Sequence, residues 1–138
     1  MIEIGRTSER SWTVGPQHLA SALGSGLADV LATPALVAFC EQTARASVDP
    51  ELDPGASTVG TRIEIEHTAP TPLGGTVTVV SRLIRVDGRR LRFEIHAGDE
   101  VEPIGRATHE RAIIDRARFD GRVAEKVARV RSGEIPDP

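Results

Sequence analysis

Three polar residues in the first half of the chain could carry out acid–base chemistry together. A threonine–proline step at Thr33 and Pro34 is followed by a carboxylate at Glu41, and His67 falls on the apolar face of a later predicted strand. A hydroxyl, an acid and an imidazole that converge could activate water and move a proton to a leaving group. With the free amides of a helix N-terminus beside them, they suit attack on a carbonyl. Hydrolysis of an acyl thioester is therefore our leading hypothesis.

The stretch from Leu31 to Ala46 is predicted to form an apolar helix that ends at about Ser47. Thr33-Pro34 suits its start, because a threonine oxygen can cap free amides and proline at the first helical position loses no needed donor. Small and apolar residues at helical spacing predict a wide face covered by a sheet, and they are Ala35, Leu36, Phe39, Cys40, Thr43 and Ala44. The helical rise separates positions 33 and 41 by about 12 Å. Thr33 and Glu41 can therefore meet only if the chain before the helix folds back, or if they come from different subunits.

Strands are predicted on both sides of this helix. Alternation and β-branched residues indicate strand segments at 10–14, 76–86, 91–97 and 101–114. A further strand contains His67, whose side chain shares the inner face with Ile63 and Ile65. One helix followed by four successive antiparallel strands, with a short strand before it, predicts an α+β fold in which one curled sheet wraps around the helix. Because such a sheet leaves strand edges unpaired, we expect a homodimer.

Two segments lie outside this framework. Residues 17–29 are rich in glycine, serine and alanine, which predicts a short helix and then a mobile loop. That loop is either a lid over a site or an ordinary connection. The charged tail from Arg116 to the end carries Val123, Val127 and Val130 at helical spacing, so we expect a surface helix there. The whole chain, 1–138, is expected to be one domain.

Composition argues against several function classes. The formal net charge is -3 and there is no long basic block, so a general nucleic-acid-binding protein is not expected. No apolar stretch approaches the length of a membrane span or a signal-peptide core, which predicts a cytoplasmic protein without a membrane partner. Cys40 is the only cysteine and is expected to be a buried small residue rather than a nucleophile. No histidine, cysteine or carboxylate spacing predicts a metal site, and no cofactor is expected. His109, next to Arg111 on the last strand, is less suggestive than His67.

Five short segments carry a resemblance that spans about residues 14–115: Ala32-Thr33-Pro34 with Glu41 eight positions after the threonine, Ser57–Thr61, His67–Pro72, Asp87–Leu91 and Ile104–Arg111. In these segments the chain resembles the fluoroacetyl-CoA thioesterase family, a branch of the hot-dog-fold acyl-CoA thioesterases. The resemblance implies a long helix wrapped by a curved antiparallel sheet, in a dimer with sites at its interface. It also implies an acyl-CoA substrate, with coenzyme A as part of that substrate.

The same resemblance assigns residues. Thr33, Glu41 and His67 fall on the family's catalytic threonine, glutamate and histidine, and Gly60 falls on a glycine that lines the acyl pocket. Pro34 and Arg111 are candidate substrate-binding residues. In such enzymes the glutamate attacks the thioester or activates water, while the threonine and histidine support it. The fluoroacetyl-specific enzyme has phenylalanines in a lid before the helix, whereas residues 24–30 here contain none. A different small or medium acyl-CoA is therefore expected.

Two other functions compete with hydrolysis. A hot-dog enoyl-CoA hydratase would add water to a double bond, but those enzymes resemble one another in an aspartate and a histidine near the helix start, where this chain has Thr33 and Pro34. A non-catalytic acyl-CoA-binding dimer would keep the fold without turnover. Retention of all three polar residues argues against it, and ligand binding without release of free thiol would favour it.

Overall fold

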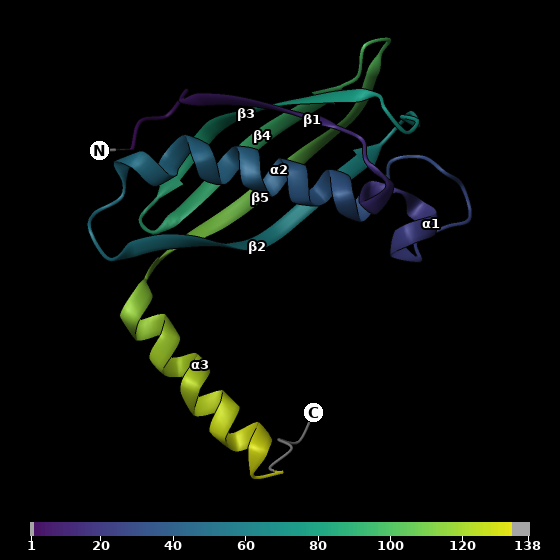
Figure 1. The fold of residues 1–138 in the computed structure, drawn as a ribbon. Coiled ribbons are helices and arrows are strands. Elements are labelled where there is room, and N and C mark those ends of the chain that lie inside the picture. The colour runs from purple at the N-terminus through teal and green to yellow at the C-terminus, as the bar shows by residue number, and fades with distance from the viewer. Residues whose placement is uncertain (1, 134–138) are drawn as a thin grey trace.

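A curved antiparallel sheet wraps around one long helix in the computed structural model, which describes residues 2–133 (Figure 1). The elements in chain order are β1 (Thr7–Thr13), η1 (Pro16–His18), α1 (Ala20–Leu23), α2 (Thr33–Val48), η2 (Asp49–Glu51), β2 (Ala56–His67), β3 (Thr76–Asp87), β4 (Arg90–Gly98), β5 (Pro103–Asp115) and α3 (Arg116–Arg131). The strand order is β1-β3-β4-β5-β2, and neighbouring strands are antiparallel. The predicted α+β architecture is confirmed.

Helix α2 begins at Thr33, as its sequence predicts, but its N-terminal cap differs from the expectation. The N-cap residue is Ala32, which has no side chain capable of capping, and Pro34 occupies the first turn. The expectation that the Thr33 oxygen caps the helix is wrong, because Thr33 lies one position inside it. Its hydroxyl is therefore available for another partner, described below.

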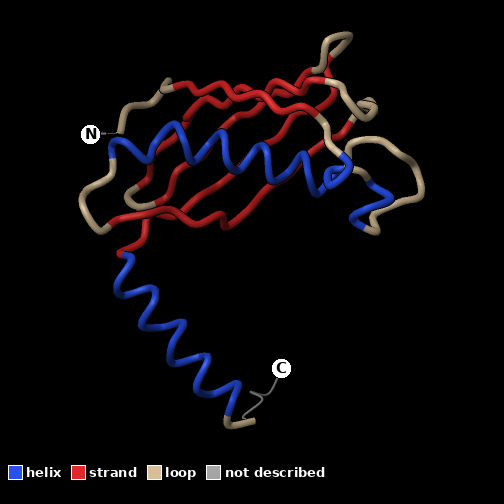
Figure 2. The backbone as a smooth tube through the Cα atoms, in the orientation of Figure 1, coloured by secondary structure: helices blue, strands red, loops and turns tan. Residues whose placement is uncertain are grey.

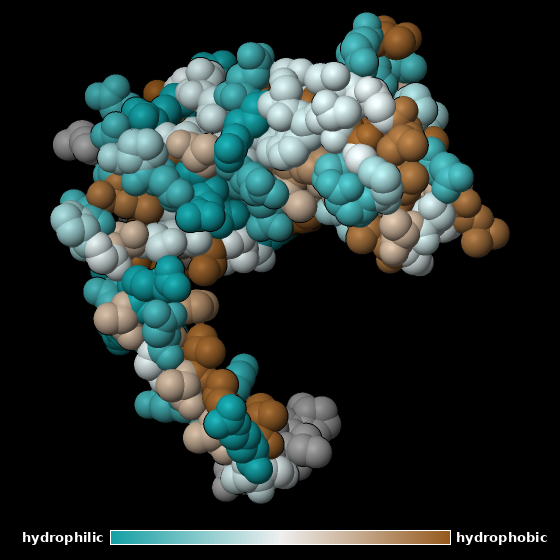
Figure 3. Space-filling model, viewed as in Figure 1, coloured by the Kyte–Doolittle hydropathy of each residue, from teal (hydrophilic) through white to brown (hydrophobic). Residues whose placement is uncertain are grey.

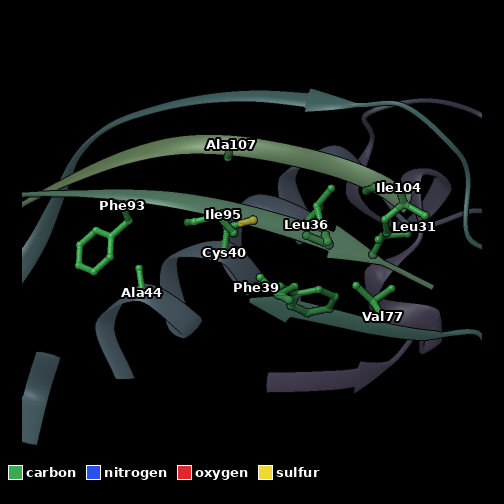
Figure 4. Close-up of a cluster of buried hydrophobic side chains, with 14 of the residues drawn as sticks. Leu31, Leu36, Phe39, Cys40, Ala44, Val77, Phe93, Ile95, Ile104 and Ala107 are labelled. Atoms are coloured by element: carbon green, nitrogen blue, oxygen red, sulfur yellow. The ribbon is translucent and has the colours of Figure 1, made fainter. Parts of the chain in front are cut away.

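The core lies between α2 and the inner face of the sheet. The predicted apolar face of α2 is buried, and Figure 4 shows Leu36, Phe39 and Cys40 pointing toward strand residues that include Ile95 and Ala107. Trp12 of β1 stacks on Phe39 with ring centroids 4.3 Å apart. Burial of a large apolar side chain contributes about 1.5–3 kcal/mol. This packing fixes the helix against the sheet and with it every side chain that α2 presents.

The strands follow the predicted segments with two differences at their ends. β1 begins at Thr7, three residues earlier than expected, because Thr7 pairs with Arg82 at the end of the β1–β3 ladder. β5 begins at Pro103, two residues later than expected, because Asp99 accepts hydrogen bonds from the Val101 and Glu102 amides and holds them in a turn. The predicted Asp87-Gly88 hairpin is confirmed, with Gly88 in the left-handed region at φ 60°.

Strand β2 forms one edge of the sheet and leads to the helix that leaves it. β2 pairs with β5 on one side only, from Ala56 opposite Asp115 to His67 opposite Gly105. α3 continues directly from β5 and projects away from the body, as the tube in Figure 2 shows. The predicted surface helix is confirmed over Arg116–Arg131, and the end of the predicted tail beyond residue 133 lies outside the described residues. None of the helices in the described part is long and apolar enough to span a membrane.

Candidate active site

Thr33 and His67 meet where the start of α2 faces the end of β2. The Thr33 hydroxyl oxygen lies 2.8 Å from His67 Nδ1, within hydrogen-bond distance. The alternation of β2 places His67 on the inner face with Ile63 and Ile65, as predicted. Because His67 is the last residue of β2, it lies beside the first turn of the helix. The helix start supplies Thr33 and the strand end supplies His67, so the pair depends on the packing of α2 against β2.

The imidazole of His67 is held in a form suited to proton transfer. Burial lowers the pKa of His67 below its ordinary value, so the ring is neutral at pH 7. Its Nε2 atom is buried and has no hydrogen-bond partner among the described residues. The pair borders a shallow depression of about 290 Å³ that is also lined by Val30 and Leu31.

Glu41 lies in a second cluster, farther along α2. Its Oε2 atom is 3.3 Å from Arg111 Nη1 on β5 and 4.0 Å from His109 Nε2. A Cβ atom added to Gly60 on β2 would overlap the same carboxylate oxygen, so a side chain there would displace the carboxylate. The β2–β5 register shifts between Gly60 and Arg62, which marks a β-bulge. Gly60, Glu41 and Arg111 thus come together in one cluster.

Arg111 is a buried cation, and hydrogen bonds to several neighbours fix its position. Its side chain is 5% exposed, and it donates from Nε to the Thr58 hydroxyl at 2.9 Å and from Nη2 to the Thr58 carbonyl at 3.1 Å. Burial lowers the pKa of Arg111, and the nearby charge of Glu41 opposes that effect. A guanidinium has five N–H donors, and four of those of Arg111 point to acceptors on Thr58, His109 and Glu41. Arg111 therefore presents the Glu41 carboxylate with a fixed positive partner.

His109 belongs to this cluster, although its sequence position suggested little. It is 1% exposed, and its Nδ1 lies 2.7 Å from the Arg62 carbonyl oxygen. Because a carbonyl can only accept, Nδ1 carries the hydrogen and Nε2 accepts from Arg111 Nη1 at 3.1 Å. Burial lowers the pKa of His109, which keeps the ring neutral. Strand alternation from Ala107 to Arg111 was the signal that could have placed His109 on the inner face.

The two clusters are separate within one chain. Eight helical residues separate Thr33 from Glu41 by about 12 Å, and seven strand residues separate Gly60 from His67 by about 23 Å. No hydrogen bond or ion pair among the described residues joins the two clusters. Pro34 is exposed at the start of α2, beside Thr33. The structure thus pairs the threonine with the histidine and the glutamate with the arginine, and leaves a gap between the pairs.

The thiol of Cys40 does not contribute to either cluster. Cys40 is buried, and burial, with a smaller effect from the Glu41 charge, raises the pKa of its thiol to about 12. A thiol with that pKa is not a nucleophile at neutral pH. Within the described residues, no group of three or more histidine, cysteine, aspartate or glutamate side chains could hold a metal ion.

The lid-like segment before α2 is fastened at its base. Leu19 and Leu31 form an isolated antiparallel bridge, and the Ala20 amide donates to the Val30 carbonyl at 2.9 Å. At its tip Leu27 is completely exposed. The segment contains no aromatic side chain that could reach the Thr33–His67 pair.

The chain is similar to several known proteins. The family model described as "Fluoroacetyl-CoA-specific thioesterase" matches residues 14–117. The fluoroacetyl-CoA thioesterase of Streptantibioticus cattleyicolor is 43% identical over 98 residues, which cover 71% of this chain and 70% of that protein. A solved structure of the fluoroacetyl-CoA thioesterase FlK superimposes with a TM-score of 0.87 at 35% identity, covering 91% of this chain and 98% of that one.

Two further solved structures support the fold. A thioesterase superfamily member from Thermus thermophilus superimposes with a TM-score of 0.90 at 25% identity, and the match covers 96% of this chain and 98% of that one. A hot-dog-like protein from Thermanaerovibrio acidaminovorans superimposes with a TM-score of 0.84 at 26% identity, over 91% of this chain and 93% of that one. The predicted hot-dog fold is confirmed by these likenesses.

Proposed function

The chain belongs to the fluoroacetyl-CoA-specific thioesterase family, and from this premise we propose that it hydrolyses a small or medium acyl-CoA through Thr33, Glu41 and His67. That it is an acyl-CoA thioesterase follows from the family; the residues and the acyl group are the proposal. The observation that carries it is the 2.8 Å contact between Thr33 Oγ1 and His67 Nδ1 beside the N-terminus of α2. There a hydroxyl, a neutral imidazole and helix amides lie together, which suits a carbonyl that becomes an oxyanion.

In the proposed reaction, the Glu41 carboxylate either takes a proton from water as the water oxygen adds to the thioester carbon, or attacks that carbon itself. The carbonyl oxygen gains negative charge and is stabilised by the amides at the start of α2 and by the Thr33 hydroxyl. Pro34 contributes no amide hydrogen. The carbon–sulfur bond then breaks, and the departing thiolate takes a proton, for which neutral His67 and its hydroxyl partner offer a path. In the direct-attack route, breakage of the carbon–sulfur bond leaves an acyl anhydride on Glu41, and a water molecule then hydrolyses it and frees the carboxylate. Both routes give the free acid and coenzyme A.

A homodimer would bring the two clusters into one site. The outer edge of β2 has no strand beside it in the described chain, and such an edge can pair with a second copy. In an antiparallel pair with a two-fold axis near Ile63, His67 would lie opposite the partner's Gly60, and so near the partner's Glu41. The gap between the clusters within one chain supports this arrangement, which uses the threonine and histidine of one copy with the glutamate of the other.

Gly60 and Arg111 are proposed to serve the substrate mainly through Glu41. Gly60 leaves the space that the carboxylate and an acyl group share, and Arg111 orients the carboxylate from a buried position. With most of its N–H donors occupied, Arg111 has little capacity left for direct substrate contact. Pro34, exposed beside Thr33, is proposed to line the acyl entrance. A single buried cysteine leaves no disulfide within a chain, which supports a cytoplasmic location.

The experiment that tests this function is thiol release from a panel of fluoroacetyl-, acetyl-, short-chain, medium-chain and aryl-CoA substrates, with Glu41→Ala in parallel. Release by the wild type and loss of release in the variant are expected, and the best substrate names the acyl class. Saturable binding of acyl-CoA without thiol release would overturn hydrolysis and favour a binding protein. Hydration of an enoyl-CoA without thiol release would favour the hydratase.

A further inference from the structure

Helix α3 carries an apolar stripe that the body of its own chain does not cover. Four large hydrophobic side chains are spaced along it at helical intervals, and their exposed fractions are 36% for Phe119, 46% for Val123, 40% for Val127 and 70% for Val130. None of the residues of α3 is buried. A helix with one apolar face normally packs that face against another surface. The stripe therefore lacks its partner in the isolated chain.

The position of α3 limits where that partner can lie. The Arg116 amide donates to the Gly55 carbonyl at 2.9 Å, and Asp115 pairs with Ala56, so α3 starts beside the first residue of β2. From there the helix projects on the side of the sheet where β2 forms the edge (Figure 1). Figure 3 shows hydrophobic side chains of α3 turned toward the hollow between the helix and the body. A partner that covers the stripe must enter this hollow, next to the unpaired edge of β2.

Charge indicates what kind of surface that partner has. α3 contains six basic and two acidic side chains, a formal charge of +4, whereas residues 1–115 contain 11 basic and 16 acidic side chains, a formal charge of -5. The body of a second copy thus carries a net negative charge, which attracts the positively charged α3. A basic amphipathic helix could also lie on an anionic bilayer. A flat bilayer, however, can contact only a stripe that faces away from the body, whereas the stripe of α3 faces the hollow between the helix and the body (Figure 3).

We propose that α3 is a dimer arm, whose stripe of Phe119, Val123, Val127 and Val130 packs against a second copy of this chain as that copy pairs with the edge of β2. The inference rests on the paired assembly of the proposed function. The family model ends at residue 117, near the start of α3. Two-fold symmetry gives each copy one arm and one surface that receives the other arm.

The test compares two double variants of the full chain that each add two glutamates to α3. Val123→Glu with Val127→Glu places both charges in the stripe, and Ala124→Glu with Ala128→Glu places them on another exposed face, about 100° around the helix. Sedimentation equilibrium without substrate should show a dimer dissociation constant raised about 10,000-fold by the first pair, since the two arms of a dimer lose four buried valines and each accounts for about tenfold. The second pair should leave it within about threefold of the wild type. Circular dichroism and thermal unfolding show whether both variants fold.

A crosslink at position 127 tests the same contact in a chain that is otherwise unchanged. A photoreactive phenylalanine at position 127, in a mixture of 14N- and 15N-labelled protein, should yield mixed-isotope crosslinked peptides, which only contact between copies can produce. Crosslinks confined to one chain would overturn the arm, as would equal association of the two double variants. Stripe-dependent flotation of monomers with phosphatidylserine-containing vesicles would overturn it in favour of a membrane surface. Thiol release is recorded separately, so a chain that associates through α3 but releases no thiol would contradict only the proposed hydrolysis.

Discussion

The carboxylate of Glu41 occupies the space that a side chain at Gly60 would fill. Oε2 of Glu41 lies so close to the α-carbon of Gly60 that a methyl group there would overlap it, and Arg111 Nη1 contacts the same oxygen at 3.3 Å. The absence of a side chain on β2 and the presence of a buried cation on β5 together fix one carboxylate on α2. This relationship gives the candidate site its most direct test.

Replacing Gly60 with alanine should displace the Glu41 carboxylate. We expect kcat/KM for the best acyl-CoA to fall about 10- to 100-fold, because a displacement of about 1 Å at a reacting group can cost that much. Gly98→Ala is the matched control, since its added Cβ would meet only ordinary contacts, the nearest at 3.5 Å. Thiol release with each variant measures the effect. A Gly60→Ala enzyme as active as the control would show that Glu41 and Gly60 do not form one site.

Mixed dimers can show whether two copies share each site. Thr33→Ala and Glu41→Gln should each lower turnover about 100- to 10,000-fold, the usual contribution of a general base or a positioned donor. If threonine and glutamate come from different copies, a dimer of one Thr33→Ala chain and one Glu41→Gln chain contains one site with both native residues. We therefore expect such mixed dimers, purified with two affinity tags, to recover about half of the wild-type turnover.

The control for this experiment is a mixed dimer in which one chain carries both substitutions and the other is wild type. It keeps no complete site when the residues are shared, because each site then takes one altered residue. If each chain instead forms its own site, this control is half active and the first mixed dimer is inactive. The two arrangements thus give opposite results.

Acid should reduce both activity and stability through His67. Its pKa in the folded chain is lowered by burial, so the imidazole remains neutral above the ordinary value of about 6.5 and charges only as the pH falls further. Over that interval the unfolded chain binds the proton first, so the free energy of unfolding decreases as the pH falls below about 6.5. His109, whose pKa is also lowered by burial, adds to the loss.

Two measurements check this pH dependence. kcat/KM should be constant near pH 7–8 and fall on the acid side, and urea unfolding should give a smaller free energy at pH 5 than at pH 7. In His67→Gln part of the stability loss should disappear, whereas His96→Gln, on the exposed outer face, should behave as the wild type. A free energy of unfolding that is the same at pH 5 as at pH 7, in both the wild type and His67→Gln, would contradict the lowered pKa of His67.

His109 is predicted to position Arg111 rather than to contact substrate. His109→Gln keeps an acceptor that can reach Arg111, whereas the shorter His109→Asn keeps only a donor for the Arg62 carbonyl. Loss of one partner of a buried hydrogen bond costs about 1–3 kcal/mol. We expect His109→Asn to lower kcat about tenfold or more through misplacement of Glu41, and His109→Gln to retain more of it. Equal losses in the two variants, with equal losses of stability, would reduce His109 to a packing residue.

The sequence by itself determined the elements and the faces they bury. Helical spacing in α2 and alternation around His67 are local patterns, and each sets which side of its element meets the core. They predicted the α+β layer, the inner position of His67 and the helix start at Thr33-Pro34. The short segments that resemble the thioesterase family then named the candidate residues, because chemistry of that kind depends on residue type and spacing.

Only the tertiary structure decided which of those residues meet. The contact between Thr33 and His67 joins positions 34 residues apart, and that between Glu41 and Arg111 joins positions 70 apart, so both depend on how β2 and β5 pack against α2. The same packing gave His109 its tautomer and showed that Ala32, not Thr33, is the N-cap of α2. It also left α3 outside the core with its apolar stripe uncovered. A local pattern cannot predict these outcomes, because each is set by the distance between elements that are remote in the chain.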